Sequence, residues 1–164
     1  MPKGEIHLEF DRPTEEMFAR ARELSGLEFL QAIASGELPP APMAVTLGFR
    51  LAEATEGRAV FEGEPTERVY NPLGMVHGGF AMTLIDSATA CAVQTLLPAG
   101  TGYGTIETKA NLTRTILHDT GLLTCEAKVV HAGGRVMTAE ARVTGADGKL
   151  YAHGTSTCLI IPPK

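Results

Sequence analysis

One long apolar segment constrains the fold of this chain more than any other feature. Residues 78–97 read GGFAMTLIDSATACAVQTLL, and Asp86, near the centre, is the only charge among them. The length approaches that of a membrane-spanning helix, but the central carboxylate, the paired glycines and the lack of flanking Lys or Arg favour a buried helix of a soluble protein. A helix that is apolar on most sides must be surrounded by protein.

The residues around this segment predict an antiparallel sheet that encloses it. Stretches rich in Thr, Val, Leu and Ile follow the helix, and Gly133-Gly134 and Asp147-Gly148 are strong hairpin signals. Two more predicted strands precede the helix. Together they predict an α+β fold, with a curled antiparallel sheet of about six strands wrapped round one long central helix. The predicted strands are 44–54, 57–64, 102–114, 121–131, 134–145 and 148–161.

The first part of the chain predicts a helical extension to this domain. Residues 14–36 have helical spacing of apolar side chains, with Thr14 as a cap and an interruption at Gly26. Three prolines between residues 39 and 42 then predict an extended linker. We therefore expect an N-terminal helical extension over 1–38 and the main domain over 39–164.

Length and charge exclude several classes of function. The chain has 164 residues, a formal net charge of -5 and no run of Lys or Arg, so the composition argues against nucleic-acid binding. Its three cysteines are far apart and its five histidines lack metal-ligand spacing, which predicts no disulfide framework, no metal and no cofactor. The charged N-terminus is unlike a signal peptide, and we expect a cytoplasmic protein that binds no membrane.

The start of the apolar helix has the features of an oxyanion site. His77-Gly78-Gly79 would expose backbone N–H groups at the positive end of the helix, and glycine allows a ligand to approach them closely. Asp86 follows about two turns later as a candidate base or nucleophile. The glycine pair alone could be a simple turn, and Asp86 could merely bond a neighbouring strand. An unpaired carboxylate in an apolar helix is costly, however, so the combination indicates chemistry.

The order of these residues is similar to that of a known family. The spacing Asn-x5-His-Gly-Gly-x6-Asp, from Asn71 to Asp86, resembles the hotdog-fold thioesterases of the phenylacetate-degradation (PaaI-like) type, also called the 4-hydroxybenzoyl-CoA thioesterase superfamily. The resemblance extends over roughly 40–162 and includes TIETKANLTR at 105–114. It implies a hotdog fold and the hydrolysis of an acyl-CoA thioester to a free acid and CoA.

The resemblance also implies a role for each residue of the motif. Asp86 would attack the thioester or activate water, and the backbone N–H of Gly78 would polarise the thioester carbonyl. Asn71 and His77 would lie beside it, and Thr105 would assist the attacking water. Each has a simpler alternative: His77 could be a helix-entry residue, Asn71 a turn former before proline, and Thr105 a β-branched strand residue.

The CoA part of the substrate would need a few local cations in an acidic chain. Arg135, beside the Gly133-Gly134 turn, resembles a basic turn that contacts the nucleotide in relatives. Arg114 and Lys109 are further candidates, and Gly79 would lie against the substrate at the helix start. The alternative for each basic residue is a solvated surface charge.

Two other functions remain open at this point. A non-catalytic acyl-CoA-binding or assembly protein could keep the fold, although the intact motif argues against it. Hydratases of the same fold resemble sequences with a helix His, or with an Asp followed five residues later by a His. This chain has Cys91 at that place, which argues against a hydratase. The free edges of a curled sheet predict a homodimer, and beyond it a homotetramer, with the active site at the subunit interface as the resemblance implies. The acyl group is left open.

Overall fold

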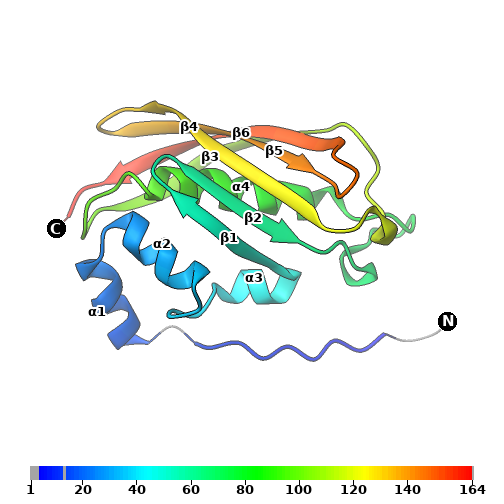
Figure 1. Ribbon diagram of the computed structural model, residues 1–164, viewed down its shortest axis with the longest axis horizontal. Coiled ribbons are helices and arrows are strands. Elements are labelled where there is room, and N and C mark those ends of the chain that lie inside the picture. Colours follow the sequence, from blue (N-terminus) through cyan, green and yellow to red (C-terminus); the bar gives the residue numbers. More distant parts are fainter. Residues whose placement is uncertain (1–3, 13, 164) are drawn as a thin grey trace.

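A single curved sheet with one long helix packed against it forms the body of the protein (Figure 1). The computed structural model describes residues 4–12 and 14–163. The sheet has six strands in the order β1-β2-β4-β5-β6-β3, and each neighbouring pair is antiparallel. This confirms the predicted α+β architecture. The strands are β1 Phe49–Thr55, β2 Arg58–Gly63, β3 Gly102–Leu112, β4 Leu123–Ala132, β5 Val136–Thr144 and β6 Leu150–Ile161.

The central helix α4, Gly78–Gln94, supplies the core on one face of the sheet. Its Leu84, Ile85 and Ala88 have no exposed surface, and they belong to the same apolar cluster as Leu123 of β4 and Val143 of β5. This burial explains why the helix is apolar on most sides. Within the described part of the chain, no helix has the length and hydropathy needed to cross a bilayer.

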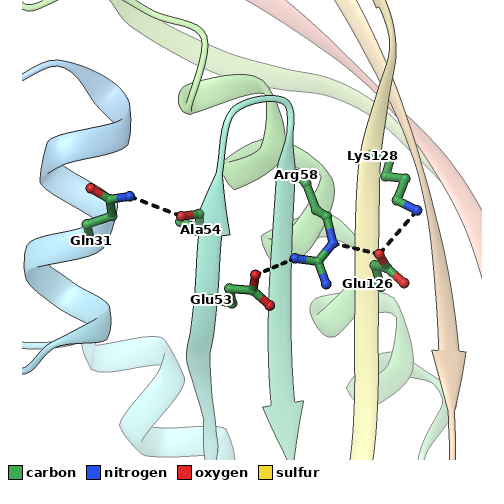
Figure 2. Close-up of polar contacts among 6 residues, drawn as sticks. All are labelled: Gln31, Glu53, Ala54, Arg58, Glu126 and Lys128. Atoms are coloured by element: carbon green, nitrogen blue, oxygen red, sulfur yellow. Dashed lines mark hydrogen bonds and ion pairs between the residues drawn. The ribbon is translucent and has the colours of Figure 1, made fainter.

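Three helices precede the sheet, α1 Glu15–Glu23, α2 Gly26–Ala34 and α3 Pro42–Leu47. Of these, α2 and α3 pack against β1 (Figure 1). Helix α2 begins where the sequence predicted an interruption, because Ser25 forms a capping box with Glu28. Leu30 of α2 is 2% exposed and belongs to the main core, and Gln31 Nε2 donates to the Ala54 carbonyl of β1 at 3.3 Å (Figure 2). The boundary at residue 38 stays a prediction, but α2 is packed into the core.

The predicted linker is shorter than expected, since only its residues 39–41 lie outside a helix, and the predicted start of the first strand is wrong. Residues 42–47 form α3, and β1 begins only at Phe49. The physical reason is the position of Pro42: proline in the first turn of a helix lacks only an N–H that would have no partner there. Gly48 then ends the helix in a left-handed conformation, with φ 75°.

A group of charged side chains lies on the face of the sheet that is turned away from α4 (Figure 2). Arg58 of β2 lies between two carboxylates, with Nη1 2.7 Å from Glu53 Oε1 and Nε 2.6 Å from Glu126 Oε1. Lys128 Nζ lies 3.3 Å from the same Glu126 oxygen. These contacts raise the pKa of Arg58 and lower the pKa of Glu126.

A β-bulge in edge strand β3 positions the residues discussed below. Thr105 is paired with Cys158 and Glu107 with Thr157, so Ile106 is an extra residue without a partner. Ile106 is 61% exposed. A bulge shifts the alternation of side chains by one residue, so Thr105 and Thr108 lie on the same face of the strand, the face toward α4.

Candidate functional site

The start of helix α4 has one backbone donor available for a ligand. The side chain of His77 caps the helix, and its Nδ1 accepts from the Gly79 N–H at 2.9 Å. The Phe80 N–H donates to the His77 carbonyl at 2.9 Å. For the Gly78 N–H, no acceptor exists among the residues that the structure describes. His77 therefore orients the helix start and leaves the Gly78 donor free.

The loop before the helix is held by Asn71. Its Oδ1 accepts from the N–H groups of Leu73 at 2.9 Å and of Met75 at 3.3 Å. The Asn71 N–H also donates to the Met75 carbonyl at 2.7 Å, which closes a turn through Gly74, whose φ is 77°. Asn71 thus shapes the turn that leads to His77, and it lines the same hollow as Gly78.

Each of the two glycines at the helix start occupies a position where a side chain would be unfavourable, for a different reason. Gly78 is outside the left-handed region, and a Cβ there would lie 3.1 Å from the Leu112 side chain. A Cβ on Gly79 would lie 2.9 Å from His77 Nδ1 and would disturb the cap. Gly78 borders an open hollow of about 380 Å³, which Arg114 also lines. The hydrogen atom at Gly78 therefore leaves room for a ligand.

Asp86 lies on the side of α4 that faces β3. Its carboxylate is half-buried, and Oδ1 accepts a hydrogen bond from Thr108 Oγ1 at 2.9 Å. A second hollow of about 530 Å³ opens beside it. Thr105 and three exposed apolar side chains, Met43, Met82 and Ile106, line this hollow. The structure therefore brings together Asp86 and Thr105, both predicted from the sequence, and adds Thr108.

Sequence reasoning missed Thr108 because the bulge is invisible in the sequence. Strict alternation from Thr105 would direct residues 107 and 109 toward the helix and Thr108 away from it. The extra residue Ile106 reverses this, so Thr108 pairs with buried Ser156 and Lys109 pairs with exposed Thr155. The only signal in the sequence is a Thr three residues after another Thr, and this pattern is too common to identify a bulge.

Gly78 and Asp86 do not meet within one chain. They are eight residues apart in one helix, which separates them by about 12 Å along the axis. The hollow beside Gly78 and the hollow beside Asp86 have no lining residue in common. A carbonyl bound at Gly78 is therefore out of reach of Asp86 of the same chain.

The cysteines near Asp86 are poor nucleophiles. Burial raises the pKa of Cys91 to about 12, with a smaller contribution from the negative charge of Asp86. Burial also raises the pKa values of Tyr103 and Cys158, again with a smaller contribution from Asp86. These groups are protonated at neutral pH, so Asp86 is the candidate reactive group in this region.

The three basic residues predicted to contact CoA lie in different places. Arg114 lines the hollow of Gly78, near the start of α4. Arg135 is exposed in the β4–β5 turn, where its carbonyl accepts from the Ile160 N–H at 2.9 Å, at the opposite end of α4. Lys109 is exposed on β3, on the face away from the helix. Within one chain they do not form a cluster.

Comparison with known proteins shows similarity to thioester hydrolases. A family model described as the thioesterase superfamily matches residues 73–152. The 1,4-dihydroxy-2-naphthoyl-CoA hydrolase of Listeria monocytogenes is 30% identical over 116 residues, which cover 70% of this chain and 92% of that protein.

Solved structures have the same fold. A phenylacetic acid degradation-related protein from Ralstonia eutropha JMP134 superposes with a TM-score of 0.71 at 28% identity, over 79% of this chain and 98% of that one. A thioesterase from Haemophilus influenzae superposes with a TM-score of 0.71 at 20% identity, over 83% of this chain and 90% of that one. The fold is the hotdog fold, and the chain belongs to the thioesterase superfamily, a family of thioester hydrolases.

Proposed function

We propose that this protein hydrolyses an acyl-CoA thioester to a free acid and CoA. The observation that carries the proposal is the pair of functional groups on α4: a free N–H at Gly78 and a carboxylate at Asp86 that a hydroxyl group orients. The naphthoyl-CoA hydrolase activity named for the Listeria relative supports CoA as the thiol part of the substrate.

The chemistry follows from these two groups. The Gly78 N–H donates to the thioester oxygen and stabilises the negative charge that forms there, an effect commonly worth about 3 kcal/mol. In the first route, Asp86 takes a proton from water while the water oxygen bonds to the carbonyl carbon. The C–S bond then breaks, and the proton passes to the thiolate. In the second route, Asp86 itself attacks the carbonyl carbon, and the C–S bond breaks so that CoA leaves as the thiolate. Water then hydrolyses the acyl-aspartate to the acid and free Asp86, and one proton of that water passes to the thiolate.

A second copy of the chain would bring the two groups together. Strand β3 is at an edge of the sheet and pairs only with β6 in the described structure. If two β3 edges pair about a two-fold axis, two α4 helices run antiparallel beside each other. Met82 lies midway between Gly78 and Asp86 and is 42% exposed. With the axis near Met82, Gly78 of one copy faces Asp86 of the other.

The same arrangement gives a role to the exposed apolar side chains. Met43 is 54% exposed and Ile106 is 61% exposed, beside the carboxylate of Asp86. Such side chains become buried by a second copy and by the acyl group of the substrate. We propose a homodimer, or a tetramer built from such dimers, in the cytoplasm, with Arg114 and Arg135 as contacts for the CoA phosphates.

Release of thiol from a panel of acyl-CoAs tests the function. The panel covers short, long and aromatic acyl groups, and a disulfide reagent detects free CoA. We expect turnover of at least one class, and we expect Asp86→Asn to lower kcat at least about a hundredfold with an unchanged melting curve. Binding without thiol release across the panel would identify a non-catalytic acyl-CoA-binding protein instead.

A further inference from the structure

A line of three hydroxyl groups runs from Asp86 into the core. Thr108 Oγ1 of β3 lies 2.9 Å from Asp86 Oδ1 and 3.0 Å from Ser156 Oγ of β6. Ser156 Oγ lies 2.7 Å from Thr89 Oγ1 of α4. Thr89 Oγ1 lies 2.7 Å from the carbonyl oxygen of Ile85, one turn earlier in the same helix. The line therefore connects the carboxylate to a backbone acceptor through three side chains from three elements.

Burial makes these hydroxyl groups unusual. Thr89 has no exposed surface and Ser156 is 1% exposed. The third buried polar residue in the described part of the chain, Thr95, has a structural role, because its Oγ1 accepts from the Gly57 N–H in the β1–β2 turn at 2.8 Å. Valine has nearly the shape of threonine and would fill the position of Thr89 without a polar group. The hydroxyl chain thus calls for a reason other than packing.

The number of protons shows what the chain can do. The line has four links, and Thr89 Oγ1 also lies 3.1 Å from the backbone carbonyl oxygen of Asp86, but the three hydroxyl groups carry only three protons. When Asp86 is ionised, Thr89 donates to Ser156, Ser156 to Thr108 and Thr108 to Asp86, and the link to Ile85 has no proton. When Asp86 is protonated on Oδ1, the oxygen next to Thr108, there are four protons and each donor can reverse. The carboxylic acid then donates to Thr108, and Thr89 donates to the backbone carbonyl of Ile85 or Asp86.

We propose that Thr108, Ser156 and Thr89 form a reversible hydrogen-bond chain that holds Asp86 in place both as a carboxylate and as a carboxylic acid. This inference rests on the proposed function and favours its first route, in which Asp86 gains and then loses a proton. The chain adapts to that proton without leaving a buried hydroxyl unpaired, which would otherwise be costly. The three residues are positioning residues, since only Asp86 contacts the reacting atoms.

Several other titratable groups face Asp86. They are Cys91 on α4, Tyr103 on β3 and Cys158 on β6. Glu107 of β3 lines the same hollow, although its side chain is on the face of the strand that is turned away from α4. Because burial raises the pKa values of the two thiols and of the phenol, these three stay neutral in acid solution. Glu107 is an exposed carboxylate at the same hollow, so Glu107→Gln is included to separate its contribution from that of Asp86.

Two substitutions at opposite ends of the chain have opposite effects. Thr108→Val removes the donor to the carboxylate, so the ionised form loses a hydrogen bond and Asp86 protonates at higher pH. Thr89→Val leaves the ionised form satisfied, but in the protonated form the Ser156 proton has no acceptor. Asp86 then protonates at lower pH. We expect the acid-side midpoint of the kcat–pH profile to move up by about one pH unit in the first variant and down by about one in the second.

The controls keep the test independent of folding and of turnover. Thr155→Val changes an exposed threonine next to Ser156 on β6 and should leave the midpoint unchanged. Thr108→Ser and Thr89→Ser retain the hydroxyl groups and should keep the midpoint at its wild-type value. The carboxyl 13C signal of Asp86, followed by NMR against pH, should show the same two shifts even in an enzyme that turns over no tested substrate.

The outcomes test the hydrogen-bond chain separately from the proposed function. Opposite shifts of the Asp86 midpoint in Thr108→Val and Thr89→Val support the hydrogen-bond chain, whether or not thiol is released from any acyl-CoA. Shifts of the same sign, or a Thr89→Val variant that behaves like Thr155→Val while both melt normally, overturn it. If Asp86→Asn stays fully active while the opposite NMR shifts are present, the chain exists but the proposed function of Asp86 is wrong.

Discussion

Mixing two impaired variants would show whether the active site is shared between two copies. We expect Asp86→Asn to lack the base or nucleophile, and Gly78→Val to place a branched side chain where the thioester must approach. Gly78 has an ordinary φ, so the added bulk acts mainly on the ligand and on the adjacent Leu112 side chain rather than on the backbone. Gly78→Val should lower kcat/KM more than about tenfold.

The expected recovery follows from the geometry. One carbonyl must lie about 3 Å from the Gly78 N–H and close to a water molecule or an oxygen of the carboxylate. The separation of about 12 Å along α4 is too large for this, and the backward lean of the Asp86 side chain recovers only part of it. In a mixed dimer, one site combines Gly78 of the Asp86→Asn copy with Asp86 of the Gly78→Val copy, and this site is intact. Random exchange at equal concentrations makes half of the dimers mixed, so activity should reach about a quarter of wild type.

The assay is thiol release after the two variants are unfolded together and refolded, with a different affinity tag on each. Co-purification of the tags shows that mixed oligomers have formed. Activity equal to the mean of the two parents, in a sample that contains mixed oligomers, would refute the shared site. A monomer at assay concentration with full wild-type activity would refute it as well.

Three further predictions concern stability and reactivity. Gly26→Ala should lower the free energy of unfolding by about 2 kcal/mol, measured in urea, because a Cβ there would lie 1.8 Å from the Gln94 carbonyl oxygen. Arg58→Gln should destabilise the protein by less than about 1 kcal/mol at pH 7, since its partners are partly exposed. Because Arg58 lowers the pKa of Glu126 below its ordinary 4.5, that difference should shrink as the pH falls through and below 4.5. Cys91, with a pKa near 12, should resist iodoacetamide at pH 7.5 in the folded protein, as judged by mass spectrometry.

Matched controls accompany these predictions. Gly104→Ala adds a Cβ that meets no atom within 4 Å, so its stability should stay close to wild type. An equal loss in Gly104→Ala and Gly26→Ala would contradict the close approach of α2 to the end of α4. All three cysteines should react with iodoacetamide after unfolding in guanidinium. Rapid labelling of Cys91 in the folded protein would contradict its burial.

The sequence predicts the fold well where the physical signal is local. The apolar run that becomes α4 and the hairpin turns at Gly133-Gly134 and Asp147-Gly148 depend on side-chain pattern and on turn chemistry, and both are visible in single segments. Pro42 shows where this fails. Proline is compatible with an extended segment and with the first turn of a helix, and the choice depends on how residues 42–47 pack beside β1.

The residues of the candidate site also fall into those that the sequence predicts and those that it does not. Asp86, Gly78 and His77 stand out because each is chemically unusual within its own segment. Thr108, Ser156 and Thr89 do not, since a threonine or serine in a strand or helix is ordinary, and their connection depends on a single extra residue at Ile106 in β3. Without that bulge, Thr108 would face away from α4, and Asp86 would lack the donor that now holds it. An insertion or deletion next to Ile106 would therefore affect the carboxylate more than any single substitution on β3, because it would reverse the direction of every side chain between the bulge and Leu112.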